Sequence, residues 1–330
     1  MRIVYLGSGA FGQPTLERLH QRHDVVAVVT QPDRPAGRKR QLTPTPIAQW
    51  AQQQGLTVLK TEDANEEAFV QQVAALKPDV GVVVAFGQKL SPALIAALGK
   101  LVVNLHGSLL PKYRGAAPIN WAMIQGEKTA GVTVIGLAQT MDAGAMYGKA
   151  SLEIGPTETA GELHDRLAQL GPDLLESVLD RFEQGTLTPE PQDDTQATRA
   201  PKLKKTDGTV DFTLTAEQVR NRIHGLTPWP GCRVAWQCQH TGDTQTLTLR
   251  RAEAMPNPPD FIRHRAEDAG DPLPPPGTVL DGLLVMTGQG VIKLLELQAP
   301  GTRPMKADAF TRGHHLAPGD RLAPLPDHPL

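Results

Sequence analysis

Residues 101–115 read LVVNLHGSLLPKYRG, and this stretch decides the predicted fold. Its apolar beginning, Leu101 to Val103, predicts a buried strand. Asn104 and His106 follow at a spacing that points both side chains the same way from an extended backbone. Ligands bind at the carboxyl ends of strands in an open α/β sheet, so we expect a reaction site here. The glycines and the proline that come next predict a shaped loop.

Length and composition narrow the class of protein. A chain of 330 residues predicts two domains, and its net charge of -2 argues against a nucleic-acid coat protein while allowing a local basic patch. Cys232 and Cys238 fit neither a four-ligand zinc site nor a disulfide framework. The N-terminus runs straight into a strand without a signal-peptide segment, and no apolar run is long enough to span a membrane. We therefore expect a soluble, cytoplasmic protein.

Strands alternate with helices in the first half of the chain, which predicts an α/β domain. The run from Val80 to Phe86 is almost entirely apolar, as in a strand buried on both faces of a parallel sheet. Other expected strands cover residues 2–6, 25–30, 56–59 and 131–137. Helices are expected from Pro14, over 47–54, 64–76 and 117–125, from Ser91-Pro92, and over 159–184 with a break at Gly171-Pro172.

The second half has a different pattern. Residues 188–205 are polar and aperiodic, which predicts a linker between domains at 1–187 and 206–330. Thr215 to Gln218 resembles a capping box that opens a short helix. Short alternating runs at 233–237, 246–250, 278–280, 283–287 and 291–298 predict a small antiparallel barrel. A proline- and charge-rich stretch near 255–276 predicts a surface insertion.

A glycine-rich turn, Gly7 to Gly12, follows the first strand and matches the G-x-G-x-x-G pattern of dinucleotide sites. Such sites also need an acidic residue at the end of the second strand to hold the ribose. That strand ends in Gln31-Pro32-Asp33, and Asp33 lies in a proline-bounded loop. We therefore favour an ordinary strand-to-helix turn over a nicotinamide site.

A basic segment occupies the predicted irregular loop from Gln31 to Pro46. It carries four cations, at Arg34, Arg38, Lys39 and Arg40. Such a loop is suited to phosphate contacts, whereas the alternative is a solvated cluster of charges. Its length favours a function, because long irregular connections inside a compact domain tend to be functional.

Asn104, His106 and Asp142 supply an amide, an imidazole and a carboxylate. The surroundings of Ser108 do not resemble a nucleophile elbow, and no second histidine stands at metal-ligand spacing. The set suits acyl transfer to an amine, which needs donors for an oxyanion and a route for a proton. The alternatives are a satisfied half-buried histidine, a turn-forming aspartate and an asparagine that caps the loop.

At these residues the sequence resembles the formyltransferase family that uses 10-formyltetrahydrofolate. Residues 104–115 match the family's N-x-H and H-x-S-L-L-P-x-x-x-G signature, and Asp142 stands in its D-x-G position. Gly107 replaces a more usual alanine, and Ala145 stands where a second acidic residue is common. Within the family, the chain is similar over nearly its whole length to enzymes that formylate initiator tRNA. That similarity is carried by residues 31–38, 113–119, 200–203, 228–231 and 318–322.

The resemblance implies a Rossmann-like formyl-transfer domain and an OB-like tRNA-binding domain. It implies that a monomer without metal transfers the formyl group of 10-formyltetrahydrofolate to the α-amino group of methionyl initiator tRNA, giving N-formylmethionyl-tRNA for translation initiation. The implied catalytic residues are Asn104, His106 and Asp142. The implied folate contacts are Phe86, Gly87, Gln88, Lys89, Leu90, Ser108, Leu109, Leu110 and Pro111. The implied tRNA contacts are Arg34, Arg38, Lys39, Arg40, Lys202, Lys204 and Lys205.

Two other functions stay open. The first is formylation of a small amine, such as glycinamide ribonucleotide or a nucleotide-linked amino sugar, which leaves the basic loop and the barrel unexplained. The second is a folate- or RNA-binding protein without chemistry, against which the intact set of Asn104, His106 and Asp142 argues.

Overall fold

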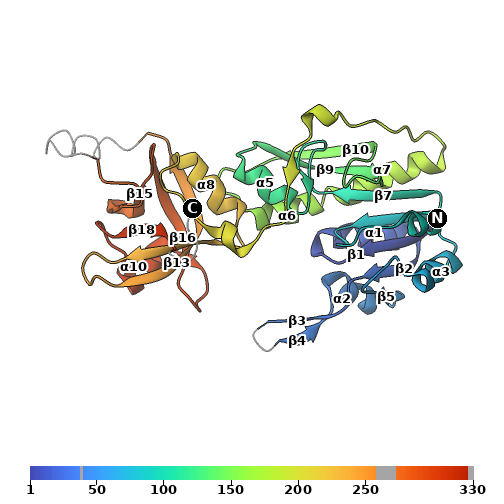
Figure 1. Cartoon of the computed structure of the whole chain (residues 1–330), viewed down its shortest axis with the longest axis horizontal. Coiled ribbons are helices and arrows are strands. Elements are labelled where there is room, and N and C mark those ends of the chain that lie inside the picture. Colours follow the sequence, from blue (N-terminus) through green and yellow to red (C-terminus); the bar gives the residue numbers. More distant parts are fainter. Residues whose placement is uncertain (38–39, 258–272, 326–330) are drawn as a thin grey trace. The chain divides into compact units, whose positions relative to one another are not determined.

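The computed structural model describes residues 1–37, 40–257 and 273–325 (Figure 1). Arg38 and Lys39 of the basic loop, and most of the predicted insertion near 255–276, lie outside these described residues. The chain forms two compact units. The first unit comprises residues 1–118, 129–152 and 164–200, and the second comprises residues 119–128, 153–163 and 201–330.

The first unit is built on a seven-stranded sheet in the order β10-β9-β7-β6-β1-β2-β5 (Figure 1). These strands are β1 (Arg2–Gly7), β2 (Asp24–Thr30), β5 (Val58–Lys60), β6 (Val80–Val84), β7 (Leu101–His106), β9 (Thr129–Gly136) and β10 (Met146–Glu153). The pairs from β7 to β5 are parallel, and β9 runs antiparallel to β7. The predicted α/β fold with a mostly parallel sheet is therefore confirmed.

Helices cover both faces of this sheet. They are α1 (Gln13–Arg22), α2 (Pro46–Gln53), α3 (Glu67–Ala75), α4 (Pro92–Ala97) and α7 (Gly171–Glu183). Two further helices, α5 (Pro118–Ile124) and α6 (Ala160–Ala168), are divided between the two units. A Cβ atom at Gly171 would lie 2.6 Å from both Leu105 of β7 and Thr15 of α1. The start of α7 therefore packs against α1 and against the face of β7 that carries Leu105. The predicted break at Gly171-Pro172 is confirmed as the boundary between α6 and α7.

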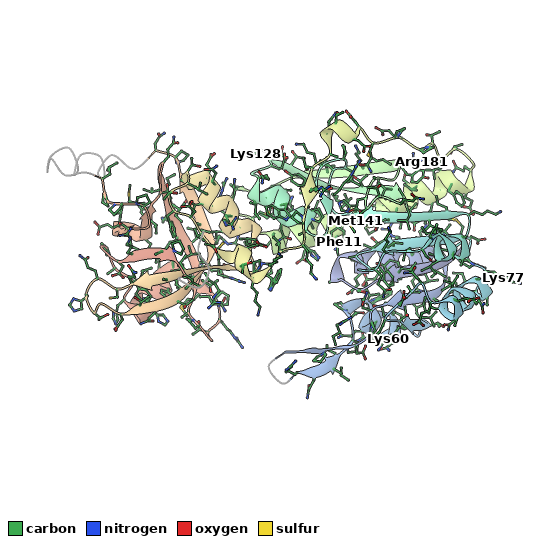
Figure 2. All side chains as sticks on the ribbon, viewed as in Figure 1. Phe11, Lys60, Lys77, Lys128, Met141 and Arg181 are labelled. Carbon is green, nitrogen blue, oxygen red and sulfur yellow. The ribbon has the colours of Figure 1, made fainter. Side chains whose placement is uncertain are left out.

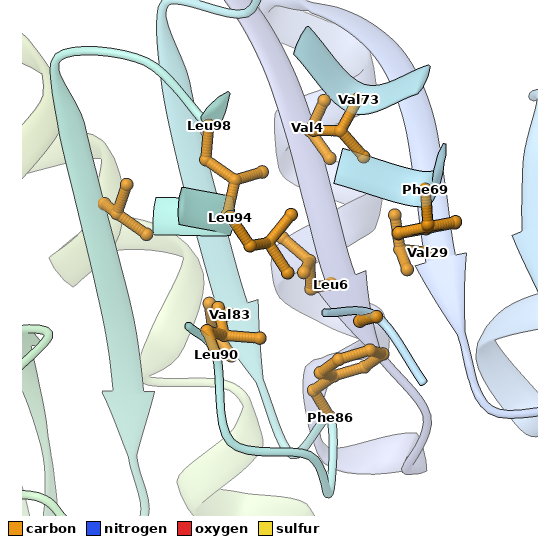
Figure 3. Close-up of a cluster of buried hydrophobic side chains, with 12 residues drawn as sticks. Val4, Leu6, Val29, Phe69, Val73, Val83, Phe86, Leu90, Leu94 and Leu98 are labelled. Atoms are coloured by element: carbon orange, nitrogen blue, oxygen red, sulfur yellow. The ribbon is translucent and has the colours of Figure 1, made fainter. Parts of the chain in front are cut away.

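The opposite face of the sheet packs against α3 and α4 through one buried apolar cluster (Figure 3). Its members include Leu94 of α4, which is fully buried, Val4 and Leu6 of β1, and Phe86, which follows β6. Val102 of β7 also belongs to this cluster. Burial of apolar side chains on both faces is the main force that fixes the sheet.

Two parts of the first unit differ from the sequence-based expectation. The segment 31–46 is not irregular throughout, because β3 (Arg34–Ala36) and β4 (Gln41–Thr43) pair as an antiparallel hairpin. No apolar periodicity predicted this hairpin, because each strand has three residues and Arg34, Pro35, Gln41 and Leu42 are exposed. The strand β10 was also missed, since Met146 is its one buried residue. A small parallel pair of β8 (Arg114–Gly115) and β11 (Arg199–Ala200) lies outside the main sheet.

The second unit contains a closed antiparallel sheet in the order β14-β15-β16-β13-β12-β18, with β17 on β16. Its elements are α8 (Ala216–Gly225), β12 (Cys232–Gln237), β13 (Thr244–Met255), β14 (Val279–Leu280), β15 (Leu284–Met286), β16 (Val291–Gln298), β17 (Met305–Lys306), α10 (Ala307–His314) and β18 (Arg321–Pro324). An antiparallel bridge between Thr278 and Arg321 joins the two ends of the sheet. The predicted antiparallel barrel is therefore confirmed, and so is the capping box at Thr215 and Gln218.

Asp320 explains the sequence motif at 318–322. Its side chain is buried and accepts hydrogen bonds from Trp236 Nε1 at 2.7 Å and from the backbone N–H groups of Gln239 and Ala317 at 2.9 and 3.0 Å. A buried carboxylate needs several donors to offset its lost hydration. The motif thus closes the end of the barrel.

His224 in α8 gives the second unit a built-in pH dependence. Its ring is buried, and Nε2 accepts a hydrogen bond of 3.1 Å from the backbone N–H of Ala252. Burial, together with the charges of Arg220 and Arg251, lowers the pKa of His224 from 6.5 to about 4. Between these two values the unfolded chain binds more protons than the folded chain, so stability rises with pH over that interval and is fully present above the ordinary pKa.

We predict that His224→Gln removes this dependence, because the glutamine amide is neutral and can still accept through its oxygen. From pH 7 to pH 5 the unaltered chain should lose about 2 kcal/mol more unfolding free energy than the variant does. Urea denaturation at a series of pH values measures this difference. His240→Gln, at an exposed histidine, is the matched control and should behave like the unaltered chain. Equal pH slopes in His224→Gln and the unaltered chain would contradict the assignment.

Candidate active site

Strand β7 carries two of the three predicted catalytic residues. It continues past Val103 to His106, so Asn104 and His106 lie within the strand rather than after it. Both share the sheet face of Val102, because side chains alternate along a strand. Asn104 is half-buried, and among the residues that the structure describes its side-chain amide has no hydrogen-bond partner. An amide in this position can serve a ligand.

The ring of His106 is held through one nitrogen and faces Asp142 with the other. Nε2 lies 3.0 Å from the carbonyl oxygen of Tyr113. A carbonyl oxygen only accepts, so Nε2 carries a proton and donates it. Nδ1 lies 3.7 Å from Asp142 Oδ2, and the two side chains are 7% and 13% exposed. This separation is longer than a direct hydrogen bond, but it allows an ion pair when the ring is protonated.

Asp142 is fixed by contacts from two other segments. Its Oδ2 accepts a hydrogen bond of 2.9 Å from the backbone N–H of Gly115. Its backbone oxygen accepts one of 2.8 Å from Gln192 Nε2. The preceding residue, Met141, is 65% exposed (Figure 2). The turn therefore keeps its carboxylate inside while its outer side faces solvent.

Three residues in or next to these loops have a strained backbone. Ala85, Tyr113 and Asp142 have φ values of 48°, 61° and 56°, a region that residues other than glycine rarely adopt. Each such residue costs roughly 1–3 kcal/mol and persists where the surrounding contacts determine it. Ala85 directly precedes the predicted folate contacts at 86–90, Tyr113 lies in the loop after His106, and Asp142 is itself a predicted catalytic residue.

The loop after His106 is held by hydrogen bonds within the loop and to Thr133 of β9. Ser108 is buried, and its hydroxyl donates a hydrogen bond of 2.7 Å to the carbonyl oxygen of Lys112. Thr133 of β9 donates to the carbonyl oxygen of Ser108 at 2.7 Å and accepts from the N–H of Leu110 at 3.1 Å. The Ser108 hydroxyl thus closes the loop, and this geometry does not support a serine nucleophile.

The predicted folate residues offer mainly backbone groups. Phe86 and Leu90 are buried in the apolar cluster, and Leu110 is buried as well. The side chain of Gln88 is engaged, because it accepts from the N–H of Ala64 at 2.8 Å and donates to the carbonyl oxygen of Thr61 at 3.0 Å. Gly87 and Leu90 make no backbone hydrogen bond to any residue that the structure describes. Leu109 and Pro111 are half-buried, and Lys89 is exposed.

The glycine-rich turn is a packing feature. Tyr5 is fully buried, and its hydroxyl donates to the carbonyl oxygen of Gly12 at 3.0 Å. A Cβ atom at Gly12 would lie 1.9 Å from that hydroxyl, so glycine is needed to make room for Tyr5. Asp33, the candidate ribose ligand, forms an ion pair of 2.6 Å with Lys60. Both observations favour the ordinary turn over a dinucleotide site.

The predicted tRNA contacts that the structure describes are all exposed. Arg34 lies on β3 and Arg40 precedes β4, in the first unit. Lys202, Lys204 and Lys205 belong to the second unit. Arg38 and Lys39 lie outside the described residues.

Four groups at this site escaped the sequence reasoning. They are the carbonyl of Tyr113, the N–H of Gly115, the hydroxyl of Thr133 and the side chain of Gln192. Two are backbone groups, which every residue possesses, so no residue type signals them. Within the described part of the chain, no group of three or more His, Cys, Asp or Glu residues is placed to hold a metal ion, and no helix has the length and apolar character of a membrane span.

Comparison with known proteins decides the family. The family model described as formyl transferase matches residues 1–179, and the model of the formyl transferase C-terminal domain matches residues 202–315. The chain belongs to the formyl transferase family. The methionyl-tRNA formyltransferase of Geobacter metallireducens is 41% identical to it over 323 residues, which cover 98% of each chain. That of Heliobacterium modesticaldum is 40% identical over 98% of this chain and 100% of its own.

Solved structures show the same fold at low identity. One of them is an N-formyltransferase from Helicobacter canadensis in complex with folinic acid and dTDP-3-aminofucose. The match covers 88% of this chain and 98% of that protein, with 14% identity and a TM-score of 0.62. HypX from Aquifex aeolicus, in complex with tetrahydrofolic acid, matches 94% of this chain and 47% of its own, with 16% identity and a TM-score of 0.57. At these identities the likeness concerns the fold.

We predict that Gly144→Ala destabilises the first unit. A Cβ atom at Gly144 would lie 1.7 Å from the carbonyl oxygen of Gly136, so the turn that carries Asp142 would have to move. The expected loss of unfolding free energy is about 2–4 kcal/mol, measured by chemical denaturation. Gly9→Ala is the control in the same unit, because its Cβ atom would make an ordinary contact of 3.6 Å with Ala85. If both variants were equally stable, the close approach at Gly144 would not be a constraint.

Proposed function

We propose that this chain transfers the formyl group of 10-formyltetrahydrofolate to the α-amino group of methionyl initiator tRNA, giving N-formylmethionyl-tRNA for translation initiation. The observation that carries the proposal is the match along 98% of the chain to methionyl-tRNA formyltransferases. The geometry of Asn104, His106 and Asp142 is consistent with this reaction. The proposal places the reaction in the cytoplasm and assigns it to a monomer.

The chemistry begins when the neutral α-amine attacks the formyl carbon of the folate. A C–N bond forms, and the formyl oxygen becomes an oxyanion that needs hydrogen-bond donors. The unpartnered side-chain N–H₂ of Asn104 is suited to donate to that oxygen. This assignment uses the one group on β7 that is half-buried and has no partner among the described residues.

The proton of the attacking amine must then leave the nitrogen. Because Nε2 of His106 donates to Tyr113, the free ring nitrogen is Nδ1, which can accept that proton. Asp142 stabilises the resulting imidazolium from 3.7 Å. His106 next returns the proton to N10 of the folate as the C–N10 bond breaks and its electron pair goes to N10. The products are N-formylmethionyl-tRNA and tetrahydrofolate.

The two loops at 86–90 and 108–111 fit a folate co-substrate. A pterin ring presents a planar edge of hydrogen-bond donors and acceptors, which backbone groups can match. The backbone of Gly87 and Leu90 has no partner among the described residues, and Leu90 is 9% exposed. We propose that the backbone groups of Gly87 and Leu90 bind the pterin, and that the buried side chains of Phe86 and Leu110 pack behind it.

The exposed cations fit a polyanionic partner. We assign Arg34, Arg38, Lys39 and Arg40 to the acceptor end of the tRNA, and the lysines at 202, 204 and 205 to its phosphates. In this division of labour, residues 1–187 form the formyl-transfer and folate-binding domain. Residues 206–330 form the tRNA-binding domain, and 188–205 connect the two.

We predict that His106→Ala and Asp142→Ala each lower kcat for formyl transfer by about 10³-fold, because each removes part of the proton route. Binding of methionyl-tRNA should change little, since neither side chain is assigned to tRNA. Single-turnover transfer of labelled formyl and a separate tRNA binding assay measure the two quantities. Ser177→Ala, at an exposed residue of α7 that is assigned no role, is the control and should retain full activity. Equal losses of binding and chemistry would contradict these roles, and preference for a nucleotide-linked amino sugar over methionyl-tRNA would overturn the proposed substrate.

We predict that Arg38→Ala raises KM for methionyl-tRNA while kcat at saturating tRNA stays within about threefold, because a phosphate contact contributes to binding. The slope of log KM against the logarithm of the salt concentration should also fall by about 1, which corresponds to the loss of one phosphate contact. Lys100→Ala removes an exposed cation of the first unit that is assigned no role, and serves as the control. An unchanged rate at subsaturating tRNA would refute the assignment of Arg38.

A further inference from the structure

We propose that Gln192 is a positioning residue for the reaction. Its side-chain amide fixes the turn that carries Asp142 to the loop that carries Tyr113 and Gly115. The inference rests on the proposed formyl transfer for its kinetic consequences. The contacts that carry it lie within the first unit.

Every hydrogen-bonding capacity of the Gln192 side chain is used. Nε2 donates to the backbone oxygens of Asp142 and Gly144 at 2.8 and 2.7 Å. Oε1 accepts from Arg114 Nε and Nη2 at 3.0 and 2.7 Å. A glutamine amide has two N–H donors and an oxygen with two lone pairs, so four bonds saturate it. The side chain is half-buried, where such bonds are less exchanged with water than at an open surface.

These four bonds close a ring of contacts around Asp142. The backbone N–H of Gly115, next to Arg114, donates to the Asp142 carboxylate at 2.9 Å. Gln192 therefore ties Arg114 to the backbone of the same aspartate whose side chain Gly115 binds. The strained φ of 56° at Asp142 needs such support, because an isolated turn would relax away from it. Without Gln192, the carboxylate keeps its contact with Gly115, but the backbone of Asp142 loses the bond that holds it.

The segment around Gln192 is anchored independently, so its loss is expected to spare the fold. Glu190 pairs with Met146 through two backbone hydrogen bonds of 2.7 and 2.8 Å. Thr198 Oγ1 accepts from the N–H of Tyr113 at 2.8 Å, and β11 pairs with β8. The ion pair of Arg114 with Asp194 does not involve Gln192 and should remain when Gln192 is replaced. Asp194 is 81% exposed, so this ion pair contributes little to stability. The segment around Gln192 should therefore keep its place when the Gln192 side chain is removed.

The first experiment compares Gln192→Ala with Gln196→Ala. Gln196 is a matched control, because its exposed amide in the same segment bonds to the surface carboxylate of Asp193. We expect Gln192→Ala to lower kcat by about 10- to 100-fold, since a misplacement of about 1 Å costs that much. KM for methionyl-tRNA and for 10-formyltetrahydrofolate should stay within about threefold. Gln196→Ala should match the unaltered chain.

A conservative variant separates the bonds that Gln192 makes to Arg114 from those that it makes to the turn of Asp142. Gln192→Glu keeps the acceptors for Arg114 but sets carboxylate oxygens against the carbonyl oxygens of Asp142 and Gly144. We expect it to be as slow as Gln192→Ala, because the bonds to the turn are the ones that position Asp142. Full activity in Gln192→Glu would overturn the proposal.

A double-variant cycle tests whether Gln192 acts through Asp142. In single-turnover assays, Gln192→Ala should slow an Asp142→Ala enzyme by less than about twofold, because the group that it positions is already gone. A general structural role would lower both backgrounds by the same factor. That result would overturn the inference while leaving the proposed formyl transfer intact.

One readout is independent of activity. The N–H of Gly115 is protected by the Asp142 carboxylate, so its hydrogen exchange should become faster by about tenfold in Gln192→Ala and remain unchanged in Gln196→Ala. Unchanged exchange of Gly115 in Gln192→Ala would overturn the positioning role. A lack of formyl transfer by the unaltered chain would instead overturn the proposed function, and the exchange measurement would still decide the role of Gln192.

Discussion

The carboxylate of Asp142 lies beside the ring of His106 because the chain folds back on itself after β9. That strand runs antiparallel to β7, with His106 opposite Thr133 and Val103 opposite Gly136. The chain therefore leaves β9 three positions beyond the level of His106, and the turn between β9 and β10 brings Asp142 back toward the ring. Two backbone hydrogen bonds, from Gly136 to Ala145 and from Ala143 to Thr140, close this turn, and contacts from other segments hold Asp142 in addition.

Those contacts come from positions that are far apart in the sequence. Gly115 binds the carboxylate, and Gln192 binds the backbone of the same turn. A Cβ atom at Gly115 would lie 2.4 Å from the carbonyl oxygen of Ala200, so β8 and β11 approach closely here as well. The proposed catalytic residue Asp142 is thus contacted by a segment after α7 that carries none of the proposed reacting groups.

The sequence predicted the buried strands of the fold but not the more exposed ones. The strand from Val80 could be predicted because apolar side chains on both faces leave a continuous hydrophobic run. The edge strand β10 and the hairpin of β3 and β4 bury too few side chains to leave such a pattern. At the site, the spacing of Asn104 and His106 placed both on one face. The support from Gln192 could not be predicted, since it arises from tertiary contacts within a polar, aperiodic segment.

Solvent exposure separates the two tasks that the proposed reaction demands. His106 and Asp142 are 7% and 13% exposed, so their interaction is weakly screened by salt. Arg34, Arg40 and the lysines of the second unit are exposed, where ions of the solvent compete for phosphate contacts. Binding of a polyanion should therefore weaken with ionic strength while the chemical step keeps its rate. A chain that holds its reacting groups in the interior and its binding charges on exposed segments can tune affinity without disturbing the proton route.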